Sequence, residues 1–311
     1  MAPTQSTCTV RKVAVVGAGP AGLASATTLA DRGHQVELFE ARDHLGGQFD
    51  IAMRIPGKEE FAETIRYFTR RLDLAGVKVH LGRRVDADEL VGAGFDEVVV
   101  ATGVEPRVPD IPGVDHPMVM TYAELVRGER SAGSHVAVVG AGGIGVDVSE
   151  YLTTAHSPAL DLQAWQAEWG VGDPARTRGG LTPRHPVSSP RQVVLLQRRT
   201  TSIGSSLGRT TGWVHRAALR AKGVEHVTGV AAYERIDDDG LHVRLGPDPS
   251  QRRTFAVDTV VLCTGQVSLR TVADELAARG VTAHVVGGAD VALEIDAKRA
   301  IRQATELAAT I

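Results

Sequence analysis

Short apolar runs that lead into glycine-rich turns dominate the first part of the chain. Residues 12–16 (Lys-Val-Ala-Val-Val) are almost wholly apolar, which is typical of a buried parallel strand. They run into Gly-Ala-Gly-Pro-Ala-Gly at 17–22, and the Ala- and Leu-rich stretch that follows predicts a helix to Asp31. A second strand is predicted at 35–40. Together these segments form a βαβ unit of about thirty residues.

The same order of elements returns in the middle of the chain. A strand at 135–139 leads into Gly-Ala-Gly-Gly-Ile-Gly at 140–145, a helix to about Leu152 and eventually a strand at 192–197. Two such units predict an α/β fold with two Rossmann-like, doubly wound sheets, the second inserted in the first. We expect the first domain to comprise residues 10–128 plus 262–311 and the second to comprise 129–261.

Two further strands share one ending. Residues 95–103 and 256–265 each contain an acidic turn, a buried strand, a small residue and then Thr-Gly. The glycine lets the backbone leave the strand sharply at the edge where open α/β sheets bind ligands. Ala101, Thr102 and Gly103, and likewise Thr264 and Gly265, are therefore candidate binding residues.

Two other segments have simpler interpretations. Alternating residues around Asp-Asp-Asp-Gly at 237–240 favour a β-hairpin over a metal site. The proline-containing stretch 155–191 is long for a loop, which indicates a functional or interface element. Within it, we expect Trp165 and Trp169, four residues apart, to pack a short helix onto the domain rather than to stack on a cofactor.

Composition excludes several classes of function. The 311 residues are 43% hydrophobic and 23% charged with a net charge of -3, so nothing favours nucleic acid or an anionic membrane as a partner. No apolar run approaches the roughly 18 residues of a membrane span, and residues 1–9 lack an apolar signal region. The two cysteines, Cys8 and Cys263, cannot form a four-cysteine zinc or iron–sulfur site. We expect a soluble, cytoplasmic protein.

The first glycine motif has the chemistry of a dinucleotide site. Gly17 allows the tight turn, Gly19 lets backbone amides approach a pyrophosphate, and Gly22 lets helix and strand pack closely. The helix begins at Pro20 and Ala21, and its free N–H groups bind phosphate. Glu40, at the end of the next strand, accepts hydrogen bonds from a ribose diol and would repel a 2′-phosphate. The site therefore suits FAD or NAD rather than NADP.

The second motif differs at the corresponding strand end. Its cradle comprises Gly140, Gly142, Gly143, Ile144 and Gly145, but the next strand ends in Gln197-Arg198-Arg199 instead of a glutamate. Arginines there favour the dianionic 2′-phosphate of NADPH, with NADH as an alternative and a solvated basic pair as the competing interpretation. Arg209 lies on a nearby Gly- and Ser-rich loop that follows the same strand.

A chain with one site suited to FAD and one suited to NADPH is predicted to transfer a hydride from a nicotinamide to a flavin. That step requires alignment of two rings more than an acid or a base, so no catalytic residue is predicted. His215 is interpreted as a helix-surface histidine.

Other motifs carry a family resemblance: Gly-Gly-Gln-Phe at 46–49, Ile-Pro-Gly-Lys-Glu-Glu-Phe at 55–61, Thr-Thr-Gly-Trp-Val-His-Arg at 210–216 and Gly-Gly-Ala-Asp-Val-Ala at 287–292. With the glycine motifs, they resemble the carboxy-terminal FAD/NADPH half of bacterial iron–sulfur 2,4-dienoyl-CoA reductases (NADPH), in the group that includes trimethylamine and histamine dehydrogenases. The resemblance implies that Gly47 and Gln48 lie near the flavin. It also implies that Gly288 and Asp290 complete the FAD site, with Asp290 accepting from ribityl hydroxyls.

In that family an FMN-binding (β/α)₈ barrel and a four-cysteine iron–sulfur segment precede this region, and these residues form neither. The resemblance therefore implies an NAD(P)H-dependent FAD oxidoreductase that passes electrons to such a barrel, in trans or in a longer chain. Two alternatives are a self-standing NAD(P)H reductase with a diffusible acceptor and an ADP- or FAD-binding scaffold without hydride transfer. Disulfide reduction is not expected, because no cysteine pair lies near Gly47.

Overall fold

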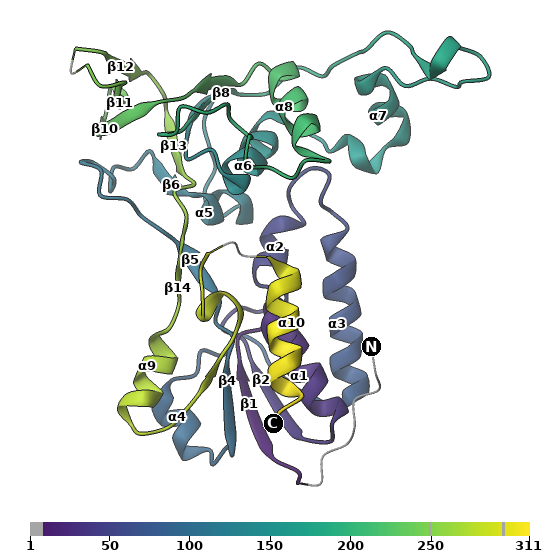
Figure 1. Ribbon diagram of the computed structural model, residues 1–311, viewed down its shortest axis with the longest axis vertical. Helices are drawn as coiled ribbons and strands as arrows, with labels where there is room; N and C mark the ends of the chain where they lie inside the picture. Colours follow the sequence, from purple (N-terminus) through teal and green to yellow (C-terminus); the bar gives the residue numbers. More distant parts are fainter. Residues whose placement is uncertain (1–8, 249, 294–295) are drawn as a thin grey trace. The chain divides into compact units, whose positions relative to one another are not determined.

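The computed structural model describes residues 9–248, 250–293 and 296–311. These residues divide into two compact units (Figure 1). The first unit comprises the described parts of 1–53, 60–105 and 266–311, and the second comprises 54–59 and 106–265. Cys8 lies outside the described residues.

The first unit is built on a five-stranded parallel sheet. Its strand order is β15 (His284–Val285), β4 (Glu97–Val100), β1 (Lys12–Val16), β2 (Gln35–Phe39) and β3 (Lys78–His80). The central strand β1 pairs with β2 on one side and with β4 on the other. Its residues Val13, Ala14 and Val15 are fully buried, as the apolar run predicts.

Small side chains let two helices pack closely on one face of this sheet. α1 (Pro20–Asp31) and α10 (Ala297–Ala308) lie side by side (Figure 1), and buried alanines of both helices belong to one core cluster. The other helices of the unit are α2 (Gln48–Ala52), α3 (Phe61–Ala75), α4 (Ala87–Gly92), α9 (Thr271–Ala278) and the 3-10 turn η3 (Gly287–Ala289). The short strands β5 (Val104–Pro106) and β14 (Gln266–Ser268) pair with each other.

The second unit repeats the architecture. Its parallel sheet has the order β6 (Val119–Thr121), β13 (Thr259–Leu262), β7 (His135–Val139), β8 (Gln192–Leu196) and β9 (Glu225–Val227). The helices are α5 (Tyr122–Arg127), α6 (Gly143–Thr153), α7 (Leu162–Trp169) and α8 (Gly212–Ala221), with 3-10 turns η1 (Pro158–Leu160) and η2 (Arg178–Gly180). A three-stranded antiparallel sheet comprises β10 (Val230–Asp237), β11 (Gly240–Leu245) and β12 (Arg252–Phe255). The expected hairpin at 237–240 is confirmed, since Asp237 pairs with Gly240.

The unit boundaries differ from the expected ones. Residues 106–128 belong with the second unit, because β6 pairs with β13 in its sheet, and the return to the first unit comes after Gly265 rather than before Leu262. Residues 54–59 also group with the second unit, although both flanking segments belong to the first. Short strands such as β6 give too weak a pattern for the sequence to assign them to a sheet.

A buried ion pair attaches α7 to the second unit. Glu168 Oε1 lies 3.0 Å from Lys222 Nζ, and the two side chains are only 10% and 7% exposed. Trp165 is exposed, so the expectation that it packs this helix onto the domain is wrong, while the Trp169 ring lies against the Arg184 guanidinium. A charged pair, rather than an aromatic one, anchors the helix.

We expect Lys222→Met to lower the free energy of unfolding by about 3–5 kcal/mol, because it leaves the Glu168 carboxylate buried and unpaired. Adding Glu168→Leu should recover most of the loss. Urea unfolding followed by circular dichroism measures both effects. Arg302→Met, at the exposed Arg302–Glu306 pair, is the control and should cost no more than about 1 kcal/mol. A small cost for Lys222→Met alone would contradict the anchoring role.

Candidate functional site

The first glycine of each motif occupies the same strained position. Gly17 has a φ of 102° and Gly140 a φ of 106°, values that L side chains rarely adopt. A Cβ on Gly17 would lie 2.5 Å from the Ala101 carbonyl oxygen, and one on Gly140 would lie 2.3 Å from that of Cys263. Only glycine lets the chain turn this close to the end of the neighbouring strand.

The third glycine lets each helix pack directly on its own turn. A Cβ on Gly22 would lie 1.8 Å from the Gly17 carbonyl oxygen, and Gly145 has the same 1.8 Å relation to Gly140. α1 and α6 therefore begin at the carboxyl end of the sheet, with their unpaired N–H groups at the edge where such folds bind phosphates.

The middle of each motif is open. Apart from the adjoining residues and the backbone of the same helix, no atom comes within 4 Å of a Cβ built on Gly142 or Gly143. A Cβ on Gly19 would have only the Gly47 Cα within that distance, at 3.8 Å. Both N-termini therefore present backbone amides beside free space, which is what a pyrophosphate requires. Pro20 follows Gly19 and begins α1, where its missing N–H costs no hydrogen bond.

Glu40 is held at the first glycine turn. Directly after β2, its Oε2 accepts a hydrogen bond from the Ala18 amide at 2.8 Å, and its Oε1 accepts one from the Arg42 amide at 2.9 Å. A carboxylate has about four acceptor positions, so two remain for further hydrogen-bond donors.

The Gly46–Gly47 turn approaches the same cradle. Gly47 has a φ of 56°, and a Cβ on it would lie 2.7 Å from the Gly19 Cα. A side chain would therefore push α2, which begins at Gln48, away from the phosphate-binding turn. The structure brings Gly47 against the first glycine motif, directly before Gln48.

The carboxy-terminal candidates lie at this cradle too. A Cβ on Gly288 would lie 3.3 Å from the Gly103 Cα, and one on Gly287 would lie 2.8 Å from the Ala21 Cβ of α1. Ala101, Thr102 and Gly103 and the turn 287–290 are therefore brought together around the N-terminus of α1.

Asp290 has a partner that the sequence motifs do not include. Its Oδ2 accepts a hydrogen bond from Gln303 Nε2 at 2.8 Å, and Gln303 Oε1 accepts one from the Gly287 amide at 2.9 Å. Gln303 thereby holds the turn that carries Asp290. In the sequence, Gln303 is one of many polar residues on the strongly amphipathic helix α10, so nothing singles it out.

In the second unit the corresponding strand end presents cations. The backbone of Gln197, Arg198 and Arg199 is fixed after β8: the Gln197 amide donates to the Val227 carbonyl at 2.9 Å, and the Arg199 carbonyl accepts from the Gly229 amide at 3.0 Å. Both arginine side chains are exposed. Within the described part of the chain, neither forms an ion pair, so both are available to an anion.

Thr264 and Gly265 are engaged with one residue. Thr264 Oγ1 donates to the Arg107 carbonyl at 2.7 Å, while the Thr264 carbonyl accepts from Arg107 Nε at 2.9 Å and the Gly265 carbonyl accepts from the Arg107 amide at 3.0 Å. These bonds hold together the two segments that leave the second unit. Cys263, just before them, is buried, and burial raises the pKa of its thiol far above the usual range.

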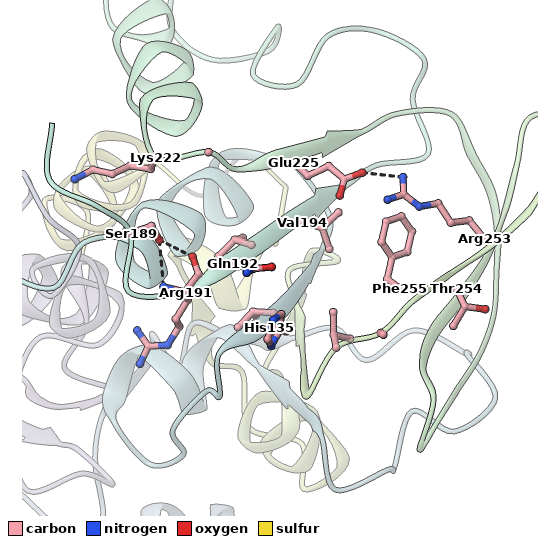
Figure 2. A pocket seen from close by; sticks show the side chains of 15 residues that line it. His135, Ser189, Arg191, Gln192, Val194, Lys222, Glu225, Arg253, Thr254 and Phe255 are labelled. Carbon is pink, nitrogen blue, oxygen red and sulfur yellow. Dashed lines mark hydrogen bonds and ion pairs between the residues drawn. The ribbon is translucent and has the colours of Figure 1, made fainter.

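A pocket of 540 Å³ opens at the amino ends of the strands of the second sheet, at the end away from the glycine motif. It is lined by residues at the amino ends of β7, β8 and β9, among them His135, Gln192 and Glu225. Figure 2 shows Arg253 reaching to Glu225 across it, 2.7 Å between Nη1 and Oε1. Dinucleotides bind at the carboxyl ends of such strands, so this pocket is separate from the glycine motif.

The acidic hairpin turn carries one further cluster. Ligand atoms of Asp237, Asp239 and His242 lie within 4.8 Å of one another. Hydrogen bonds from the Arg235 guanidinium and from His242 lower the pKa of Asp237 to about 2. Its carboxylate already has a cationic partner, so the cluster serves the turn.

Comparison with known proteins agrees with this geometry. The family model described as pyridine nucleotide-disulphide oxidoreductase matches residues 11–291. The chain belongs to this family. It is accordingly an FAD-dependent NAD(P)H oxidoreductase, and the predicted fold class, with two Rossmann-like units, is confirmed.

Among curated relatives of this oxidoreductase, the metal reductase of Desulforamulus reducens is 28% identical over 261 residues, which cover 83% of the chain and 38% of the relative. The NADH oxidase of Thermoanaerobacter brockii is 38% identical over 146 residues, 46% of the chain and 22% of the relative. The chain thus spans well under half the length of these relatives.

Solved structures share the fold. A 2-naphthoyl-CoA reductase in complex with 2-naphthoyl-CoA matches with a TM-score of 0.81 and 24% identity, over 99% of this chain and 41% of that one. Histamine dehydrogenase from Rhizobium sp. 4-9 matches with a TM-score of 0.75 and 19% identity, over 99% and 45%. Among the described residues of the oxidoreductase, no helix is long and apolar enough to span a membrane.

We expect Gly145→Ala to affect stability and Gly142→Ala to affect nucleotide binding. The added methyl at Gly145 meets a carbonyl oxygen, so it should lower the free energy of unfolding by about 1–3 kcal/mol or more. The methyl at Gly142 meets open space, so it should leave stability within about 0.5 kcal/mol and weaken NAD(P)H binding instead. Chemical unfolding and nucleotide titration separate the two. Equal destabilisation by both variants would contradict the assigned geometry.

Proposed function

We propose that this chain is the electron-input module of an NADPH-dependent system, in which FAD passes electrons to an FMN/iron–sulfur (β/α)₈ barrel of the 2,4-dienoyl-CoA reductase or amine-dehydrogenase type. One observation carries the proposal. Two cradles with the same backbone geometry end in opposite charges, Glu40 in the first unit and Arg198–Arg199 in the second.

The residues of the first unit fit FAD. The free amides at the start of α1 would hold the pyrophosphate, Glu40 would accept from the adenosine ribose, and Asp290, held by Gln303, would accept from the ribityl chain. Gly47 leaves room for the approach of α2. When bound, FAD takes up a hydride from a nicotinamide and can release the two electrons to a further acceptor.

The residues of the second unit fit NADPH. Arg198 and Arg199 would form charge-assisted hydrogen bonds with the 2′-phosphate, because guanidinium groups match the geometry of phosphate oxygens. The amides at Gly142 and Gly143 would hold the pyrophosphate on α6. A carboxylate like Glu40 at this position would instead repel the phosphate.

Two observations support a protein acceptor. The chain spans only 22% to 45% of the relatives and structures described above, so those proteins contain substantial further parts. The other is the cysteine content: among the described residues Cys263 is the one cysteine, and it is buried in the second unit, so these residues offer no exchangeable disulfide. This favours an acceptor outside the described residues, and the family resemblance points to an FMN/iron–sulfur barrel.

A self-standing reductase with a diffusible acceptor is the second candidate. A bacillithiol disulfide reductase from Bacillus cereus matches 97% of this chain and 99% of its own, with a TM-score of 0.64 and 16% identity. A protein of this fold can thus consist of little more than these two units.

The purified protein should be yellow, and anaerobic NADPH should bleach its flavin band faster than NADH does. Stopped-flow absorbance measures both rates. Adding an FMN/iron–sulfur barrel protein should then reoxidise the flavin rapidly. Turnover with a quinone at the same rate without any barrel protein would favour the diffusible acceptor. A colourless protein, or a flavin that neither nucleotide reduces, would refute the proposed reductase.

We expect Arg198→Ala combined with Arg199→Ala to raise the KM for NADPH about 10- to 100-fold and to leave that for NADH nearly unchanged, because only NADPH carries the 2′-phosphate. Steady-state reduction of a dye acceptor measures both constants. Arg176→Ala with Arg178→Ala is the matched control, an arginine pair in the 155–191 segment of the same unit. Unchanged selectivity in the first double variant would show that the arginines do not bind the phosphate.

A further inference from the structure

The first turn of α8 contacts the helix that carries the second glycine motif. His215 Nδ1 lies 2.8 Å from Glu150 Oε1 on α6, and the two side chains are 27% and 13% exposed. The helices lie side by side (Figure 1). The sequence predicts a helix-surface histidine, whereas the structure gives it a partly buried carboxylate partner.

The next residue of the same turn, Arg216, bonds to the loop that follows Arg198 and Arg199. Arg216 Nη1 donates to the Gly204 carbonyl at 2.9 Å, and Gly204 lies on the segment that runs from Arg199 to α8. Its φ of 75° makes this a tight turn, and a Cβ on Gly204 would lie 3.1 Å from the Arg216 Cγ. The first turn of α8 thus bonds to α6 through His215 and to the loop after Arg199 through Arg216.

Two other charged groups, Asp147 and Lys58, act on the imidazole. Asp147 lies on α6 one turn before Glu150, and Lys58 of the 54–59 segment pairs with Asp147 at 2.6 Å. The hydrogen bond to Glu150 raises the pKa of His215, burial opposes this, and the charges of Glu150 and Asp147 support it while Lys58 lowers it. Arg216, on the same helix, points to the Gly204 carbonyl.

We propose that His215 is a positioning residue for NADPH: through Glu150 it sets the spacing between the pyrophosphate-binding end of α6 and the loop that carries Arg198 and Arg199. The inference rests on the proposed NADPH site. An NADP molecule must contact the N-terminus of α6 through its pyrophosphate and the arginine pair through its 2′-phosphate at the same time. Its affinity therefore depends on the distance between these two regions. NADH makes only the pyrophosphate contact, so its affinity depends less on that distance.

The protonation state of His215 then controls the strength of this contact. At a pH below the ordinary pKa of histidine, His215 is an imidazolium and donates a charge-assisted hydrogen bond to Glu150, which is about twice as strong as a neutral one. As pH rises through the raised pKa in the folded protein, the charge is lost and the contact weakens. Affinity for NADPH should therefore fall as the pH rises above neutrality.

The test is the dissociation constant of NADP⁺, measured by isothermal titration calorimetry on the flavin-loaded protein between pH 6.5 and pH 9. The wild-type constant should rise about three- to tenfold over this range. His215→Gln keeps a neutral donor, so its constant should lie at the weak-binding level and be nearly independent of pH. Glu150→Gln removes the acceptor charge and should flatten the profile too.

His135→Gln is the matched control. His135 is also a histidine beside a carboxylate, 3.7 Å from Asp258, but it lies at the opposite edge of the same sheet. This variant should keep the wild-type profile. Thermal unfolding at each pH shows whether a variant remains folded over the range of the titration.

Parallel profiles for wild type and His215→Gln would overturn the inference, and so would an equal pH effect on NAD⁺ binding. Because the readout is binding of an oxidised nucleotide, it does not depend on flavin reduction. If NADP⁺ binds with the expected profile but NADPH never bleaches the flavin, the reductase proposal fails and the role of His215 stands. If NADPH bleaches the flavin but NADP⁺ binding lacks the expected pH profile, the reductase proposal stands and the role of His215 fails.

Discussion

In both units a backbone carbonyl oxygen stands where the side chain of the first motif glycine would be. The Ala101 oxygen meets Gly17 in this way, and the Cys263 oxygen meets Gly140. This steric constraint lets the chain turn sharply at the end of the central strand and lets the following helix pack on the sheet. The other binding features depend on it, because they are placed by where α1 and α6 begin.

The two cradles, alike in backbone, are distinguished by charge. In the first unit the strand after the helix delivers Glu40, whose carboxylate is fixed by the Ala18 and Arg42 amides. In the second it delivers Arg198 and Arg199, whose backbone is fixed by the β9–β10 connection. A single architecture thus presents a carboxylate at this position in one unit and two exposed guanidinium groups in the other.

Within each unit, polar residues remote from the motifs join distant segments of the chain. Gln303 holds the turn with Asp290, and His215 joins α8 to α6. Glu168, in the middle of α7, pairs with Lys222 at the end of another helix. Each looks in sequence like a solvent-facing position on an amphipathic helix. Their partners lie 13, 65 and 54 residues away (Asp290, Glu150 and Lys222), so local spacing cannot reveal them.

The sequence by itself determined the two βαβ units, the three glycine positions in each motif and the contrast between Glu40 and the arginine pair. These features are local: strand, turn and helix are adjacent in the chain, and the third glycine of each motif is required by its contact with the carbonyl oxygen of the first. Only the tertiary structure decided the assignment of β6 and of residues 54–59 to the second unit, and the partners of Gln303, His215 and Glu168. Those depend on which distant segments the packing brings together, and no period or spacing along one strand or helix encodes that.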